Sequence, residues 1–115
     1  MSVADEIQII NVQVKADTPT LLLHMTQADI DKLQQGHAQS MLVDARKVLE
    51  GAGCPYKAHV LIGEPATKIT RVAKSEAVDQ IVMGTRGMGA LGNLVLGSTA
   101  TKVIHLAEVP VTLVK

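Results

Sequence analysis

Apolar and polar residues alternate with two different periods along this chain, and the two periods separate expected strands from expected helices. Residues Glu6 to Val14 (EIQIINVQV) carry β-branched residues in both alternation phases, which is typical of a strand covered on both faces. From Thr26 onward, apolar and small residues recur every three or four positions, as in a helix that buries one face. The residues of that expected buried face are Ile30, Leu33, His37, Met41, Ala45, Val48 and Leu49.

Turn and capping residues predict where the first helix begins and ends. Thr26 followed by Asp29 resembles a capping box, and Gly51 with Gly53 marks the end of the helix. The segment from residue 15 to residue 25 opens with Ala-Asp-Thr-Pro and has no sustained period, so we expect it to be irregular. The helix is therefore expected to start after residue 26 and to stop near residue 51.

The second half of the chain repeats the change from strand to helix. Pro65 stands where a helix would begin, and proline at the first helical position costs no hydrogen bond. Ser98 is expected to cap a later helix, and Pro110 is tolerated only near the start of a strand or on an edge. Strands separated by helices favour an α/β fold: an open parallel sheet with helices on both faces. The expected elements are a strand at 56–62, a helix from 65 to about 77, a strand at 80–83, a helix from 98 to about 107 and a strand at 109–114.

Length and composition exclude several classes of protein. A chain of 115 residues fits one domain, and its apolar runs are too short to cross a bilayer. Eleven basic residues balance eleven acidic ones, and Tyr56 is the only aromatic residue, so we expect no nucleic-acid partner and no membrane partner. Cys54 is the only cysteine, and the acidic N-terminus resembles no secretory signal, which indicates a cytoplasmic protein.

The glycine-rich segment from Gly84 to Gly97 is the part of the sequence that suggests chemistry. It connects the carboxyl end of an expected strand to the amino end of an expected helix, which is where open α/β sheets bind ligands. Backbone N–H groups after Gly97 and the hydroxyls of Ser98 and Thr99 are suited to a phosphate, and Arg86 adds a fork of donors. A phosphate-bearing ligand is therefore expected here, with a plain connecting loop as the alternative.

Two common phosphate-binding patterns do not fit this segment. Gly87-x-Gly89-x-x-Gly92 matches the dinucleotide fingerprint literally, but the expected helix does not open until Ser98. A P-loop would need Gly-Lys-Ser or Gly-Lys-Thr after the glycines, and the sequence has neither. The four histidines have no spacing typical of a metal site, and Ser98 lacks the surroundings of a nucleophile. We expect no metal site and no catalytic residue.

A third pattern fits the whole segment. The spacing Gly84, Gly87, Gly97 and then Ser98 resembles the nucleotide-binding signature of the universal stress protein family. The resemblance extends to Gly63-Glu64-Pro65-Ala66, to residues 81–84 and to the closing stretch 110–114, and it implies an adenine nucleotide alpha hydrolase-like, flavodoxin-like fold in three layers. It also implies that the residues matching Gly84, Gly87, Gly97, Ser98 and Thr99 surround phosphates and ribose, and that Val12 lies where strand backbone meets adenine.

One part of the family pattern has no counterpart here. Members of the family open with a strand that ends in Asp, followed by a helix, and that strand lies in the centre of the sheet. The resemblance therefore implies one domain over residues 1–115 that is shortened at its N-terminus. Three arrangements are compatible with this difference: the chain is a fragment, the two flanking strands pair directly, or a second chain fills the gap. We expect an oligomer, because an open gap would expose edges rich in Ile and Val to water.

The resemblance implies a cytoplasmic stress-response protein that binds ATP or AMP, with or without magnesium, as a regulatory ligand. It also implies a homodimer, which family members commonly form through the closing strand. We expect no enzyme and at most weak, incidental ATP hydrolysis, since the sequence offers no general base, no metal ligand pair and no arginine-finger arrangement. The alternative is a structural or interaction module of the same fold that binds no nucleotide and acts through dimerisation alone. A nucleotide-hydrolysing enzyme is the third alternative.

Overall fold

The computed structural model describes residues 6–14, 19–85 and 97–115, which form two compact units. The first unit runs from Met1 to Glu64 and the second from Pro65 to Lys115. Each unit contains two parallel strands and two helices, and each is described here by itself. The expectation of a single domain stays a prediction.

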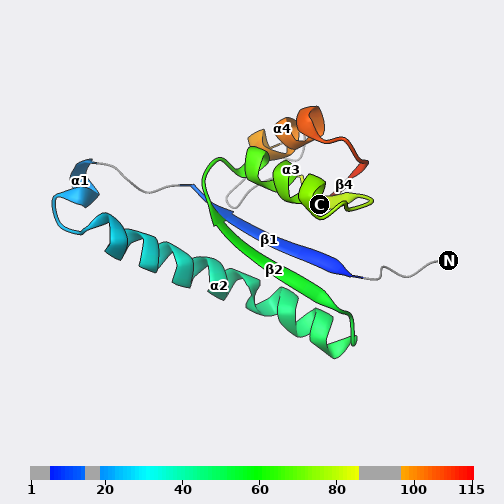
Figure 1. The fold of residues 1–115 in the computed structure, drawn as a ribbon, viewed down its shortest axis with the longest axis horizontal. Helices are drawn as coiled ribbons and strands as arrows, with labels where there is room; N and C mark the ends of the chain where they lie inside the picture. The colour runs from blue at the N-terminus through cyan, green and yellow to red at the C-terminus, as the bar shows by residue number, and fades with distance from the viewer. Residues whose placement is uncertain (1–5, 15–18, 86–96) are drawn as a thin grey trace. The chain divides into compact units, whose positions relative to one another are not determined.

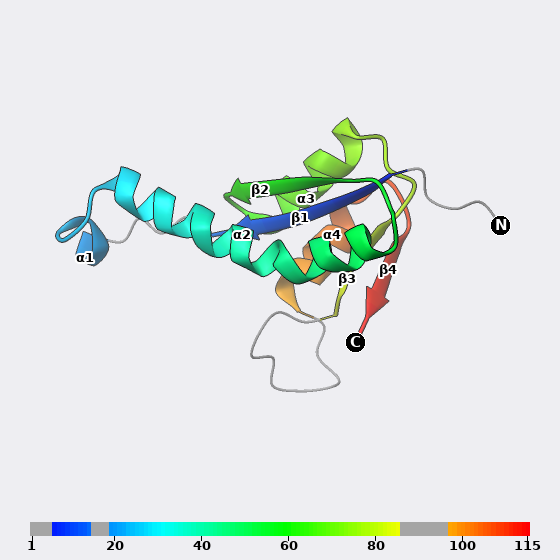
Figure 2. The same ribbon diagram turned by 90° about the horizontal axis from the view of Figure 1, so that it is seen from below.

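The first unit is a strand pair with a long helix along it. Strand β1 (Ile7–Gln13) pairs in parallel with β2 (Tyr56–Ile62), from Ile7 opposite Tyr56 to Gln13 opposite Ile62. Helix α2 (Gln27–Gly51) lies along this pair in both views (Figure 1 and Figure 2). The predicted strands and helix are thus confirmed. The segment expected to be irregular contains one short helix, α1 (Pro19–Leu22).

The ends of α2 follow the capping residues. The Thr26 hydroxyl accepts a hydrogen bond from the Asp29 N–H at 3.1 Å, which confirms the predicted N-cap. At the other end, Ala52 is the C-cap, and Gly53 has a φ of 66°, a left-handed conformation that glycine adopts at little cost. The helix therefore begins and ends where its capping residues predict.

The predicted buried face of α2 is correct at three of its seven residues: Ile30 is buried, and Ala45 and Leu49 are half-buried, whereas the other four are exposed. The structure buries Ile30, Ala38 and Leu42, and it leaves His37 exposed. The predicted residues Leu33, Met41 and Val48 are 63%, 44% and 70% exposed. The reason is that this helix carries two overlapping apolar stripes, and the strand pair covers only one of them. The second stripe lies beside the first on the flank of the helix.

The second unit is built around a small core. It contains helix α3 (Pro65–Ser75), strand β3 (Ile81–Gly84), helix α4 (Ser98–Leu106) and strand β4 (Val111–Val114). Its buried core residues are Ala66, Ile81 and Val103, one each from α3, β3 and α4. Strands β3 and β4 pair in parallel, and Pro110 lies just before β4, where its carbonyl accepts the Ile81 N–H at 2.9 Å. Pro65 is the first residue of α3, as predicted.

The strands form two parallel pairs, β1 with β2 and β3 with β4, each in a two-stranded sheet of its own. Parallel strands alternating with helices confirm the predicted α/β class. Direct pairing of the two flanking strands, one of the three arrangements considered above, is not how the described strands are hydrogen-bonded. The edge of β1 opposite β2 and the edge of β3 opposite β4 therefore lack a strand partner in the described residues.

Candidate functional site

The end of β3 and the start of α4 are joined by backbone hydrogen bonds. Thr85 follows β3 directly, and its N–H donates to the Val114 carbonyl at 3.0 Å. The Thr85 carbonyl in turn accepts the Gly97 N–H at 2.7 Å. Gly84 precedes Thr85, and Ser98 follows Gly97. The predicted site residues Gly84, Gly97 and Ser98 therefore lie together with Thr85 where segment 86–96 leaves β3 and enters α4. The sequence prediction that the strand end and the helix start form one site is consistent with this geometry.

Gly97, and not Ser98, is the N-cap of α4. Gly97 has φ −63° and ψ 154°, and its carbonyl accepts hydrogen bonds from the Thr101 N–H and the Thr101 hydroxyl, both at 3.0 Å. Ser98 is the first residue of the helix, so the prediction that it caps the helix is wrong. A glycine cap has no side chain to bond the N–H groups of the first turn. The helix start therefore keeps donors and the positive end of its dipole for an external anion.

The first turn of α4 presents its hydroxyl groups beside these donors. Ser98 is exposed, Thr99 is partly buried and Ala100 is buried with 2% exposure. Ala100 thus anchors the turn against the unit, while the preceding serine stays accessible. The small side chain of Ala100 lets the first turn of α4 pack closely against the second unit. The arrangement is suited to phosphate contact by backbone and hydroxyl groups together.

Two predicted site residues, Arg86 and Gly87, lie outside the described residues. Val12 belongs to the first unit, in β1 opposite Leu61 of β2. The structure therefore brings Gly84, Gly97, Ser98 and Thr99 together in the second unit, and Val12 is placed only within its own strand pair.

The backbone of Val12 faces the open edge of β1. The Ile7 N–H donates to the Pro55 carbonyl at 3.0 Å, and the Gly63 N–H donates to the Gln13 carbonyl at 2.8 Å. In a parallel ladder alternate residues direct their N–H and C=O to the same neighbour, so the odd-numbered residues of β1 bond to β2. Val12 therefore directs its N–H and C=O to the side opposite β2.

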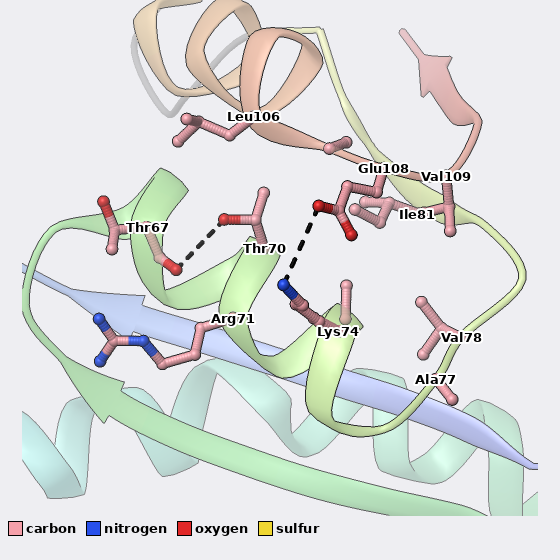
Figure 3. Close-up of a pocket in the computed structure, with 12 residues that line it drawn as sticks. Thr67, Thr70, Arg71, Lys74, Ala77, Val78, Ile81, Leu106, Glu108 and Val109 are labelled. Carbon is pink, nitrogen blue, oxygen red and sulfur yellow. Dashed lines mark hydrogen bonds and ion pairs between the residues drawn. The ribbon is translucent and has the colours of Figure 1, made fainter.

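A second feature, which sequence reasoning missed, lies at the other end of β3. A hollow of about 560 Å³ is lined by residues of α3, the start of β3 and the segment from α4 to β4 (Figure 3). Ile81 begins β3 and lines this hollow, whereas Gly84 ends the strand at the candidate site. No sequence motif marks the hollow, because its walls come from stretches around residues 67–81 and 106–109 that are apart in sequence. The hollow and the glycine segment are separate features.

Three polar side chains that line the hollow, those of Thr70, Lys74 and Glu108, have partners within the second unit. Lys74 Nζ lies 4.0 Å from a Glu108 carboxylate oxygen, and both side chains are about three-quarters exposed (Figure 3). The Thr70 hydroxyl donates to the Ala66 carbonyl at 2.8 Å. An ion pair this exposed contributes roughly 0–1 kcal/mol to stability. The rest of the wall is mainly aliphatic, so the hollow offers no catalytic constellation.

The described residues contain no group of three or more His, Cys, Asp or Glu side chains placed to hold a metal ion. No helix within the described ranges has both the length and the apolar character that membrane crossing requires.

Parallel strands, crossover helices and a glycine-bounded segment at a strand end define an α/β protein of the kind that binds ligands at the carboxyl ends of its strands. A family model described as "Universal stress protein family" matches residues 3–115. The chain belongs to the universal stress protein family.

Individual relatives agree with this assignment. The chain is 37% identical to universal stress protein MJ0531 of Methanocaldococcus jannaschii over 86 residues, which are 75% of this chain and 51% of that protein. It is 52% identical over 64 residues to a universal stress protein of Thermus aquaticus, covering 55% of this chain and 47% of that one. The chain therefore spans about half the length of these two curated relatives.

Solved structures show the same fold. The structure of the hypothetical protein MJ0577, solved for "structure-based assignment of the biochemical function", superposes on this chain with a TM-score of 0.81 at 26% identity. That match covers 96% of this chain and 75% of MJ0577. Universal stress protein UspA from Lactobacillus plantarum matches with a TM-score of 0.78 at 20% identity, over 96% of this chain and 77% of that one.

Proposed function

We propose that this chain binds an adenine nucleotide, ATP or AMP, at residues 84–99 as a regulatory ligand in a stress response. The observation that carries the proposal is the 2.7 Å hydrogen bond from the Gly97 N–H to the Thr85 carbonyl. It holds the first turn of α4, whose N-cap Gly97 makes no side-chain hydrogen bond, at the carboxyl end of β3. A phosphate there would accept hydrogen bonds from the first-turn N–H groups and from the hydroxyls of Ser98 and Thr99.

The base and the remaining phosphate contacts are assigned to three further residues. In this proposal, the N–H and C=O of Val12 pair with the hydrogen-bonding edge of adenine. Arg86 adds charge-assisted hydrogen bonds to the phosphates, and Gly87 allows backbone to approach them. Magnesium, where present, is held by the nucleotide phosphates in place of a dedicated protein site.

Regulation by binding, without turnover, is the mode of action that we propose. The assigned contacts are backbone N–H groups, hydroxyls and one arginine, which bind phosphate without supplying a general base. We therefore assign no catalytic residue. The cytoplasmic location expected from the sequence stays a prediction.

Calorimetric titration of the 115-residue chain with ATP and magnesium tests the proposal. We expect a dissociation constant on the order of micromolar, which corresponds to about 8 kcal/mol of binding free energy. Gly97→Val should weaken binding at least about tenfold, or about 1.4 kcal/mol, because a branched side chain at the N-cap covers the N–H groups that receive phosphate.

Gly36→Val serves as the matched control. A Cβ at Gly36, in the middle of α2, would meet nothing within 4 Å, so this variant introduces the same side chain away from the site. It should bind ATP like the unmodified chain. Absence of heat from a folded, monodisperse sample, or equal affinity of Gly97→Val, would contradict the nucleotide proposal and favour the interaction module.

A further inference from the structure

The hollow in the second unit is built from segments of that unit alone. Its volume of about 560 Å³ lies within the roughly 300–1,000 Å³ of sites that bind small molecules. Its lining residues come from α3, from the turn that leads into β3 and from the segment between α4 and β4 (Figure 3). The hollow therefore needs no residue of the first unit, and none of its lining residues belongs to the proposed nucleotide site.

Large aliphatic side chains supply much of the lining. They are those of Val78, Ile81, Leu106 and Val109, and we call these four residues the aliphatic wall. Ile81 is buried, Val78 and Val109 are half-buried, and Leu106 is 51% exposed. An aliphatic group that entered the hollow would remove these surfaces from water, which favours binding.

One positive and one negative side chain stand together at the hollow. Lys74 near the end of α3 and Glu108 just after α4 both line it, and the Lys74 Nζ lies 4.0 Å from a Glu108 carboxylate oxygen (Figure 3). Their side chains are 77% and 74% exposed, so both charged groups are accessible to a ligand. Because an ion pair this exposed is weak, a ligand that offers each group a new partner can replace it.

The ends of two helices add to this charge pattern. Helix α3 ends at Ser75 and α4 ends at Leu106, and residues from both ends line the hollow. The C-terminal end of a helix favours a cation beside it. Arg71, which also lines the hollow, lies one turn before Lys74 on α3 and adds a second positive charge. The hollow thus offers negative groups to an ammonium and positive groups to a carboxylate.

We propose that the hollow binds the zwitterion of an aliphatic α-amino acid such as leucine. The ammonium of the ligand pairs with the Glu108 carboxylate, its carboxylate pairs with the Lys74 ammonium, and its side chain packs against the aliphatic wall. A purely anionic ligand leaves Glu108 beside a like charge, and an alkylammonium does the same to Lys74. A zwitterion is the head group that satisfies both side chains.

The short distance between the two side chains favours an amino acid over a peptide. The ammonium and the carboxylate of an α-amino acid are attached to one carbon atom, so they match partners that lie 4.0 Å apart. In a peptide, each peptide unit between the two charged ends adds about 3.8 Å between successive Cα atoms. We therefore expect a dipeptide of leucine to bind more weakly than leucine itself.

An NMR titration of the full 115-residue chain with leucine tests the proposal. We expect the methyl signals of the aliphatic wall to shift along one binding curve with a dissociation constant on the order of 1 mM, because the charged partners are exposed. The methyl signal of Thr99, in the first turn of α4, should not follow this curve, since the hollow is lined from the other end of that helix.

Two analogues of leucine isolate the two charges of the ligand. 4-Methylpentanoate lacks the ammonium and 3-methylbutylamine lacks the carboxylate, whereas both keep the branched aliphatic chain. Each should bind at least about threefold more weakly than leucine, because each loses one ion pair. Glycine keeps the zwitterion without the aliphatic chain, and it should bind at least about tenfold more weakly because it covers none of the aliphatic wall.

Two variants isolate the corresponding partners in the protein. Lys74→Gln and Glu108→Gln should each raise the dissociation constant for leucine at least about threefold. Glu108→Gln should not weaken 4-methylpentanoate, which has no ammonium to lose a partner. Lys68→Gln is the matched control, because Lys68 lies on the same helix as Lys74 and does not line the hollow. Circular dichroism checks that all three variants fold.

Three results would overturn the proposal. The first is the absence of shifts in the aliphatic wall up to the solubility limit of leucine. The second is equal affinity for leucine and both analogues, which would indicate contact with apolar surface alone. The third is the same loss of affinity in Lys68→Gln as in Lys74→Gln. Because no nucleotide is added and leucine carries no phosphate, each of these results leaves the nucleotide proposal to its own test.

Discussion

Ala77 adopts a backbone conformation that suits glycine better than alanine. Among the described residues it is the one non-glycine residue with a positive φ, 51°. It follows the end of α3, where the Val78 N–H donates to the Ala73 carbonyl at 3.1 Å and closes the last turn. Left-handed conformation costs a residue with a Cβ roughly 1–2 kcal/mol. Sequence reasoning extended α3 to about this residue, and no glycine was present to mark the earlier end.

Ala77→Gly is therefore expected to stabilise the protein. The free energy of unfolding should rise by about 0.5–1 kcal/mol, since the relief of strain exceeds the added entropy of glycine in the unfolded chain. Urea denaturation monitored by circular dichroism measures the change. Ala28→Gly is the control, because Ala28 is exposed and helical, and glycine there should lower the free energy by roughly the same amount. A loss of stability in Ala77→Gly would contradict the interpretation.

The sequence predicts the ends of single helices better than it predicts which of their faces are buried. The N-cap of α2 at Thr26 and the start of α3 at Pro65 are local features, so the sequence predicts them correctly. The buried face of α2 depends on which flank meets β1 and β2, and that contact is not encoded in the helix alone. Ala38 is buried completely although its small side chain gives little signal in the periodicity. Local chemistry is predictable here, and packing partners are not.

Helix α4 is held in the second unit by one side chain in particular. Val103 is completely buried and packs with Ala66 of α3 and Ile81 of β3. Val103→Ala should lower the free energy of unfolding by about 2 kcal/mol, because it removes buried methyl groups and leaves a cavity. Ile104→Ala is the control on the same helix, since Ile104 is 43% exposed and should change the free energy by less than about 0.5 kcal/mol. Equal effects in chemical denaturation would argue against this core.

At the scale of the whole molecule, the candidate site could be predicted only in part. The alternation of strands and helices predicts that the end of β3 and the start of α4 are adjacent, and the hydrogen bond from the Gly97 N–H to the Thr85 carbonyl shows this adjacency. The nucleotide-binding role of Gly84, Gly97, Ser98 and Thr99 stays a prediction. Gly97, and not Ser98, is the N-cap of α4, because Gly97 has an extended backbone conformation and Ser98 is already helical. The hollow between α3 and α4 depends on segments apart in sequence, so no motif could have predicted it.

The hydrogen bond between Gly97 and Thr85 also matters for protein engineering. It closes the base of segment 86–96 independently of what that segment contains, at a point where strand and helix are already adjacent. Since the entropy of loop closure rises by only about 0.6 kcal/mol for each doubling of length, a foreign peptide inserted between residues 86 and 96 should cost the second unit little stability. We expect such an insertion to remove the proposed phosphate contacts of Arg86 and Gly87 and to leave the fold intact. The same short bond thus makes this segment a natural place to graft an epitope or a sensor peptide.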